Sequence, residues 1–124
     1  MRLIHPEDGM ILPSGIIQNA EETGAIVRIG DRIFEKAVAQ LAALCAFEEF
    51  KDVYVAVNIS PMQLRDIGFA EQVSTVLSET GLDPSRVQLE TTESVLLEHN
   101  DTIGTVIDAF LNSGVRIVLD DFGT

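Results

Sequence analysis

Apolar and polar positions change their period several times along the chain, and this pattern predicts alternating helices and strands. Apolar residues three or four positions apart indicate a long helix from Ala25 to about Phe47. Its apolar face is expected to consist of Ile26, Ile29, Ile33, Ala37, Leu41 and Cys45. Two later stretches with apolar residues at helical spacing predict helices that end at Gly81 and Gly114. The segment SGIIQNAEETG predicts a short helix that ends at Gly24.

Three apolar runs between these helices are expected to be strands: DVYVAVNIS, RVQLE and VRIVLDD. The first is almost continuously apolar, as is typical of parallel strands covered on both faces. MRLI is a candidate for the end of a further strand, HPEDGMILP is rich in turn residues, and TESVLLEHN is expected to be a loop or short helix. Strands and helices that alternate with short connections indicate an α/β chain with a parallel sheet, in one unit of residues 1–124.

Composition narrows the class of protein. Of 124 residues, 46% are hydrophobic and 23% are charged, which is typical of a folded globular domain. Twenty acidic residues against eight basic ones give a net charge of -12, which opposes binding to a DNA or RNA backbone. No apolar stretch approaches the roughly 20 residues that span a bilayer, and MRLIHPEDG is not a signal peptide. We therefore expect a cytoplasmic chain without membrane contact.

Nucleophilic and disulfide chemistry have little support in the sequence. Cys45 is the only cysteine, so it cannot form an intramolecular disulfide, and it lies in the apolar stretch LAALCAF as a small core residue. Ser60 and Ser94 have no histidine partner in a recognisable triad. His5 lies in the turn-rich segment and is expected to be structural.

Polar side chains stand at the ends of three predicted strands: Asn58 after VAV, Glu90 after VQL, and Asp120 and Asp121 after IVL. The carboxyl ends of parallel strands form the functional edge of α/β sheets. Amide and carboxylate oxygens suit magnesium, calcium or manganese. Two metals about 3.5–4 Å apart, with one bridging carboxylate, are an arrangement for phosphoester cleavage. The alternative is that these residues only form turns and cap the following helices.

Five segments in this order and at this spacing resemble the EAL-domain family: HPEDGMILP, NAEETG, VNIS, LETTES and LDDFGT. This is a family of bacterial phosphodiesterases that act on cyclic di-GMP, and the resemblance covers essentially the whole chain. It implies a TIM-type barrel with a modified first strand. The chain corresponds to about the first half, so the expected fold is an incomplete TIM-type (β/α) barrel, a partial EAL domain over residues 1–124.

The resemblance also implies an activity and roles for site residues. The family opens one phosphodiester of cyclic di-GMP to give linear pGpG, with Mg²⁺ or Mn²⁺ in a two-metal site. Asn58 and Glu90 resemble ligands of the first metal, Asp120 the ligand that bridges both, and Asp121 a ligand of the second. Glu90, Asp120 and Asp121 would thus be catalytic, through attack of an activated water in line with the leaving 3′ oxygen. Glu93 resembles a residue that steadies the loop after its strand, and substrate-binding residues are not assigned.

The sequence also departs from the family pattern. The Glu-Ala-Leu signature, whose glutamate is a metal ligand, is absent before Met1, and the chain stops at Thr124, before the lysine, glutamate and glutamine of the second half. We therefore expect the parent domain to be a cyclic di-GMP phosphodiesterase and the isolated chain to be inactive. One alternative is a degenerate regulatory module that binds cyclic di-GMP or a protein without hydrolysis, and another is an assembly fragment. A half barrel leaves sheet edges and an apolar face open, which predicts self-association.

Overall fold

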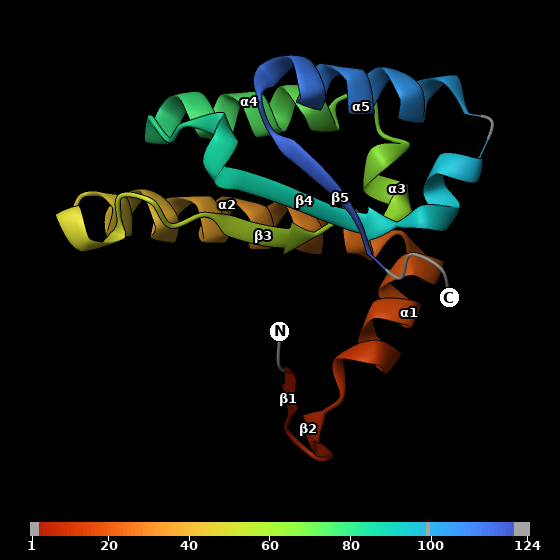
Figure 1. Ribbon diagram of the computed structural model, residues 1–124. Coiled ribbons are helices and arrows are strands. Elements are labelled where there is room, and N and C mark those ends of the chain that lie inside the picture. The colour runs from red at the N-terminus through yellow and green to blue at the C-terminus, as the bar shows by residue number, and fades with distance from the viewer. Residues whose placement is uncertain (1–2, 99, 121–124) are drawn as a thin grey trace.

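The structure, a computed structural model, describes residues 3–98 and 100–120 (Figure 1). It begins with an antiparallel hairpin of β1 (Leu3–His5) and β2 (Gly9–Ile11), in which Ile4 pairs with Met10. The Nδ1 atom of His5 accepts hydrogen bonds from the backbone N–H groups of Glu7 and Asp8, each at 3.2 Å, and so holds the turn. The hairpin is a sheet of its own, so Leu3 and Ile4, the described part of MRLI, lie in an antiparallel pair rather than in the parallel sheet.

Helices and strands then alternate, as the sequence pattern predicts. The elements are α1 (Pro13–Thr23), α2 (Ala25–Cys45), η1 (Glu48–Phe50), β3 (Val55–Asn58), α3 (Pro61–Leu64), α4 (Phe69–Thr80), η2 (Pro84–Arg86), β4 (Val87–Thr92), η3 (Glu93–Leu97), α5 (Asp101–Ser113) and β5 (Arg116–Asp120). Gly24 separates α1 from α2 because it adopts φ 78°, a left-handed conformation that ends the first helix. The predicted helix ends at Gly81 and Gly114 are confirmed.

The parallel sheet has the strand order β3-β4-β5, so the expected α/β class with parallel strands is confirmed. Helices α2, α4 and α5 frame this sheet, and the β1–β2 hairpin projects away from it beyond α1 (Figure 1). In the described part of the chain, β3 and β5 are edge strands, so the sheet is an open piece of a barrel rather than a closed one.

One face of the sheet packs on the helices and forms the core. Val57 and Leu89 are buried on this face, together with apolar side chains from α2, α4 and α5. Phe69 and Phe110 meet edge to face within the core, with ring centroids 5.5 Å apart. Such aromatic pairs add about 0.5–1.5 kcal/mol beyond the burial of their area. The core therefore fixes how the three strands line up.

The opposite face of the sheet is open, so the expectation that β3 is covered on both faces is wrong for the described residues. Ala56 and Asn58 on β3 are exposed, and Val118 on β5 is 38% exposed. The strand itself begins at Val55, and Tyr54 before it is 54% exposed. The apolar residues of β3 therefore lie on both faces of the strand, although no described element covers the face with Ala56.

The predicted apolar face of α2 is partly wrong. The residues of α2 that are buried are Ile26, Gly30, Phe34, Val38 and Leu41. Ile33, which was expected to be in the core, is 39% exposed. The helix carries apolar residues on two adjacent faces, and the one with Phe34 and Val38 packs on the core while Ile33 borders a cleft described below. The helix also ends at Cys45, before Phe47.

Cys45 is half-buried against the core, and its Sγ lies 3.7 Å from the carbonyl oxygen of Phe50. This position agrees with a small packing residue. No helix within residues 3–98 and 100–120 combines the length and apolar character needed to cross a membrane.

Candidate functional site

Asn58 and Glu90 lie side by side where β3 and β4 approach their carboxyl ends. They are partners in the parallel register, and the backbone N–H of Ile59 donates to the carbonyl oxygen of Glu90 at 2.8 Å. Neighbouring strands lie roughly 4.8 Å apart, so both side chains leave the sheet from adjacent points. Register partners point to the same face, and here it is the open one, because the alternate positions Val57 and Leu89 are buried under the helices.

Asp120 joins this face from the third strand. It is the register partner of Thr92, which lies two positions beyond Glu90 on β4. Since side chains alternate between faces, Glu90, Thr92 and Asp120 point to the same side. Two residue rises are roughly 6.6 Å, so Asp120 stands further out along the strands than Glu90.

A cleft of about 670 Å³ runs between this edge of the sheet and helices α1 and α2. Asn58, Glu90 and Asp120 line it, together with Glu21 of α1 and apolar residues of α2 that include Ile33. Another hollow, of about 620 Å³, lies along α2 beside Gln72 of α4 and is lined by none of the strand-end residues. The first cleft is therefore where the predicted site residues meet.

The Glu90 carboxylate is oriented by its own strand. The side-chain Nε2 of Gln88 donates a hydrogen bond to Oε1 of Glu90 at 3.1 Å. Gln88 is two positions away on the same face, so the contact keeps the carboxylate over the open sheet. A neutral donor of this kind fixes the group without removing its negative charge.

The donor set is suited to a hard divalent cation. Asn58 offers an amide oxygen, and Glu90 and Asp120 offer carboxylates, which are the ligands that magnesium and manganese prefer. Within residues 3–98 and 100–120, no three His, Cys, Asp or Glu side chains form a group able to hold a metal ion. The strand ends bring together two carboxylates and one carboxamide. Asp121, the fourth predicted ligand, lies outside the described residues.

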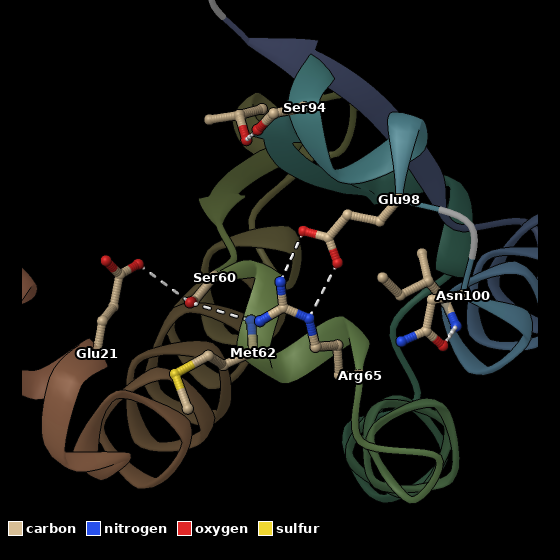
Figure 2. Close-up of polar contacts among 9 residues, drawn as sticks. Glu21, Ser60, Met62, Arg65, Ser94, Glu98 and Asn100 are labelled. Carbon is tan, nitrogen blue, oxygen red and sulfur yellow. Dashed lines mark hydrogen bonds and ion pairs between the residues drawn. The ribbon is translucent and has the colours of Figure 1, made fainter.

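Glu93 follows directly after β4, as the first residue of η3, and its side chain is half-buried. The hydroxyl groups of Thr92 and Ser94 on either side of it are hydrogen-bonded to each other at 2.9 Å (Figure 2). This hydroxyl pair closes a tight turn at the strand end. Ser94 thus has a local structural partner.

The turn after Asn58 is held by a set of contacts that the sequence analysis missed. Ser60 caps α3 by accepting from the backbone N–H of Met62 at 3.3 Å, and its Oγ also donates to Oε1 of Glu21 at 3.2 Å (Figure 2). Gln63 completes a capping box by accepting from the backbone N–H of Ser60 at 3.1 Å. The segment Ser-Pro-Met-Gln carries the sequence signal of this motif, a Ser three positions before a Gln.

A salt bridge joins the segments that follow β3 and β4. Arg65 donates from Nε and a terminal guanidinium nitrogen to the two carboxylate oxygens of Glu98, at 3.0 and 2.6 Å (Figure 2). The salt bridge is bidentate, and its two parallel hydrogen bonds define the geometry better than one hydrogen bond would. It fixes the segment after η3 against α3, beside the strand ends.

Asp31 on α2 lies behind this turn, where its Oδ1 accepts from Nε2 of Gln63 at 3.4 Å. Partial burial raises the pKa of the Asp31 carboxyl above 3.8, because desolvation disfavours its charged form. Hydrogen bonds from Gln63 and Gln72 oppose this rise, while the nearby charges of Asp66 and Glu35 add to it.

Comparisons with known proteins agree with this fold. The family model described as EAL domain matches residues 1–124. The chain is 42% identical over 120 residues to an uncharacterized protein, y4lL, of Sinorhizobium fredii, covering 97% of this chain and 14% of that protein. It is 35% identical over 124 residues to the bifunctional diguanylate cyclase/cyclic di-GMP phosphodiesterase MucR of Pseudomonas aeruginosa, covering 100% of this chain and 18% of that protein.

Solved structures show the same likeness. A PaMucR phosphodiesterase in complex with c-di-GMP superposes with a TM-score of 0.90 at 34% identity, over 99% of this chain and 49% of that chain. The chain therefore spans about half of that solved phosphodiesterase and less than a fifth of the two curated relatives. With its open parallel sheet and its matched sequence, the chain belongs to the EAL domain family, and its described fold is part of the family's TIM-like barrel.

Proposed function

We propose that Asn58, Glu90 and Asp120 form part of the metal site of a cyclic di-GMP phosphodiesterase. The parent domain would hydrolyse cyclic di-GMP to linear pGpG with Mg²⁺ or Mn²⁺ in a two-metal site. The observation that carries this proposal is that three oxygen donors from three successive strands share one face and one cleft. Relatives described as cyclic di-GMP phosphodiesterases, and one solved in complex with c-di-GMP, support the choice of substrate.

Each residue has a role that its position allows. Asn58 and Glu90, as register partners, would hold the first cation, and Asp120, further out, would be a ligand shared with a second cation, for which Asp121 would be a further ligand. Bound cations would lower the pKa of a water molecule and neutralise charge on the phosphoryl oxygens. Gln88 would keep the Glu90 carboxylate in place. Glu93 would steady the segment after β4, since it is the first residue of the turn that leaves this strand.

Charge favours a cation-dependent mode of nucleotide binding. The chain has a net charge of -12, and the site face itself carries the carboxylates of Glu90 and Asp120. Cyclic di-GMP carries two phosphodiester groups and is an anion, so the acidic cleft repels it unless a cation intervenes. We therefore expect nucleotide binding to require Mg²⁺ or Mn²⁺.

The 124-residue chain by itself is proposed to bind without hydrolysis. Phosphoryl chemistry needs a site in which charges are held in a water-excluding cavity. Here the face with Asn58 is open to solvent, and the chain spans 49% of the matched phosphodiesterase. The second candidate function is a regulatory module that binds cyclic di-GMP or a protein partner without cleavage, and the same open face favours it for the isolated chain.

Self-association belongs to the same proposal. In the described sheet, β3 and β5 are edge strands whose outer sides pair with no other strand. On the open face, the residues Tyr54 and Val118 are 54% and 38% exposed. Edges and apolar faces of this kind tend to pair with another chain. Residues 1–124 would act as one unit, in the cytoplasm, with the open sheet as the surface of contact. A monodisperse monomer in sedimentation velocity would contradict this part of the proposal.

Calorimetric titration of the chain with cyclic di-GMP, with and without Mg²⁺, tests the function when the same samples are assayed for pGpG. We expect Mg²⁺-dependent binding that Asn58→Ala weakens and Glu79→Gln does not, since Glu79 lies on α4 and does not line the cleft. Formation of pGpG would show that the chain is an active enzyme and contradict the proposed lack of hydrolysis. Absence of binding under all conditions would contradict the site itself.

A further inference from the structure

The turn that follows Asn58 is fixed by a buried carboxamide. We propose that Gln63, with Asp31 behind it, is a positioning residue that sets the orientation of the Asn58 side chain. This inference rests on the proposed function in so far as Asn58 is a metal ligand. Its structural part, that Gln63 determines where Asn58 points, can be tested without any metal.

Gln63 is a polar residue in a place where polar groups need partners. Gln63 is 1% exposed, and both the oxygen and the nitrogen of its side-chain amide form hydrogen bonds. Its Oε1 accepts from the backbone N–H of Ser60 at 3.1 Å, and its Nε2 donates to Oδ1 of Asp31 at 3.4 Å. A carboxamide supplies an acceptor and a donor on one planar group without having to bind a proton. Burial without these two bonds would be costly, so the bonds define the position of the turn.

The backbone of α2 is shaped to receive this side chain. A Cβ on Gly30 would overlap Nε2 of Gln63 and lie 2.5 Å from its Oε1. Real side chains do not approach so closely, so Gly30 is the residue that lets Gln63 reach Asp31 on the next position of the helix. The contact is therefore built into the packing of α3 on α2.

Ser60 receives a further contact from α1, where Glu21 accepts from its hydroxyl at 3.2 Å (Figure 2). Helices α1 and α3 thus both contact Ser60, two positions beyond Asn58, while α2 holds Gln63. Asn58 itself is paired with Glu90 in the sheet, and the N–H of Ile59, the next residue, donates to the Glu90 carbonyl. A segment fixed at both ends leaves the Asn58 side chain a narrow range of directions over the cleft.

The variant Gln63→Glu changes this contact while keeping its shape. The glutamate retains an acceptor for the Ser60 N–H, but in its ionised form it replaces the donor with an oxygen that faces the Asp31 carboxylate. The double variant Asp31→Asn with Gln63→Glu restores a donor opposite that oxygen, because the new side-chain amide on α2 can donate across the contact in the reverse direction. Asp31→Ala, which removes the acceptor of the Gln63 amide along with the contact to Gln72, serves as a second variant.

The first measurement needs no metal: the ¹⁵N-labelled chain is examined for the Asn58 side-chain amide signals and for hydrogen exchange at the Ser60 backbone N–H. We expect Gln63→Glu to shift the Asn58 signals and speed exchange at Ser60, Asp31→Ala to do so less, and the double variant to return both toward wild type. Mn²⁺ titration should show affinity about 10- to 100-fold weaker in Gln63→Glu, as for other residues behind metal ligands, with recovery in the double variant.

Unchanged Asn58 signals in folded Gln63→Glu or Asp31→Ala protein would overturn the inference whatever the chain does with Mn²⁺. A double variant that stays as perturbed as Gln63→Glu would overturn it as well. If the wild-type chain binds no Mn²⁺ while the signals behave as expected, the proposed function fails and the positioning role stands.

Discussion

Asn58 on β3 and Glu90 on β4 are register partners in the parallel sheet, so two residues far apart in sequence leave the same face at adjacent points. The pairing follows from the core, because Val57 and Leu89 on the opposite face are both buried under the helices. A slip of β3 by one residue would turn Asn58 toward the core and Val57 toward solvent. The packing that stabilises the sheet therefore also places the site.

Glu90→Gln is predicted to leave the fold intact and to abolish stabilisation by Mn²⁺. The glutamine keeps an oxygen that can accept from Gln88, while the negative charge is lost. A cation at 100 times its Kd stabilises a protein by about 2.7 kcal/mol, so the wild-type midpoint should rise on addition of Mn²⁺. Thermal unfolding with and without Mn²⁺ measures the difference, with Glu79→Gln as control. An equal Mn²⁺ shift in Glu90→Gln would remove Glu90 from the site.

Gly30→Ala is predicted to destabilise the chain by about 1–3 kcal/mol, because the new methyl group would overlap the Gln63 side chain. Gly104→Ala in α5 is the matched control, since a Cβ there meets nothing within 4 Å. In that open helical position, alanine should raise the free energy of unfolding by up to about 1 kcal/mol, because alanine favours the helix more than glycine does. Urea unfolding should show a lower free energy of unfolding for Gly30→Ala and a higher one for Gly104→Ala. A higher free energy of unfolding in both variants would show that Gln63 moves aside at little cost.

Thr91→Val is predicted to raise stability by about 1 kcal/mol. The side chain of Thr91 is 3% exposed, and its hydroxyl has no hydrogen-bond partner among the described residues. Valine has nearly the same shape and removes the cost of burying an unpaired polar group. Thr80→Val, at a hydroxyl that donates to the Val76 carbonyl at 2.9 Å, provides the contrast and should bring no gain. A loss of stability in Thr91→Val would reveal a partner for the Thr91 hydroxyl.

Asp31→Asn is predicted to stabilise the chain at neutral pH and to lose this advantage in acid. Desolvation raises the folded-state pKa of Asp31 above 3.8, so the folded state binds this proton more tightly than the unfolded state. Its contribution to stability is therefore present below 3.8 and declines as pH rises through the raised pKa. Asparagine is neutral throughout and still accepts from Gln63. Denaturant unfolding from acid to neutral pH measures this, and a pH-independent difference would contradict the assignment.

Much of the fold was predictable because its signals are local. Gly24, Gly81 and Gly114 end helices where the sequence indicates, and Asn58 ends a strand as predicted. The strand with Glu90 also pairs in parallel, but it continues to Thr92, two residues beyond its predicted end. These features depend on backbone conformation and on apolar period, which short stretches of sequence carry.

The choice of the buried face of α2 and the contacts of Gln63 were not predictable in the same way. Helix α2 is apolar on two neighbouring faces, and only its packing decides that Phe34 is buried while Ile33 borders the cleft. Likewise, the close approach of Gln63 to Gly30 joins two helices, so no single segment of sequence contains it. The capping signal at Ser60 shows the turn but not the buried partners behind it.

The most direct test of the central claim is to titrate Mn²⁺ into the ¹⁵N-labelled chain and follow which backbone amide signals broaden by paramagnetic relaxation. A cation held at the strand ends predicts that the signals of Asn58, Glu90 and Asp120 disappear first, at low Mn²⁺, and that Asn58→Ala delays all three. Broadening that begins elsewhere, for example at the exposed acidic residues Glu48 and Glu49 of η1, would contradict a metal site at the carboxyl ends of β3, β4 and β5.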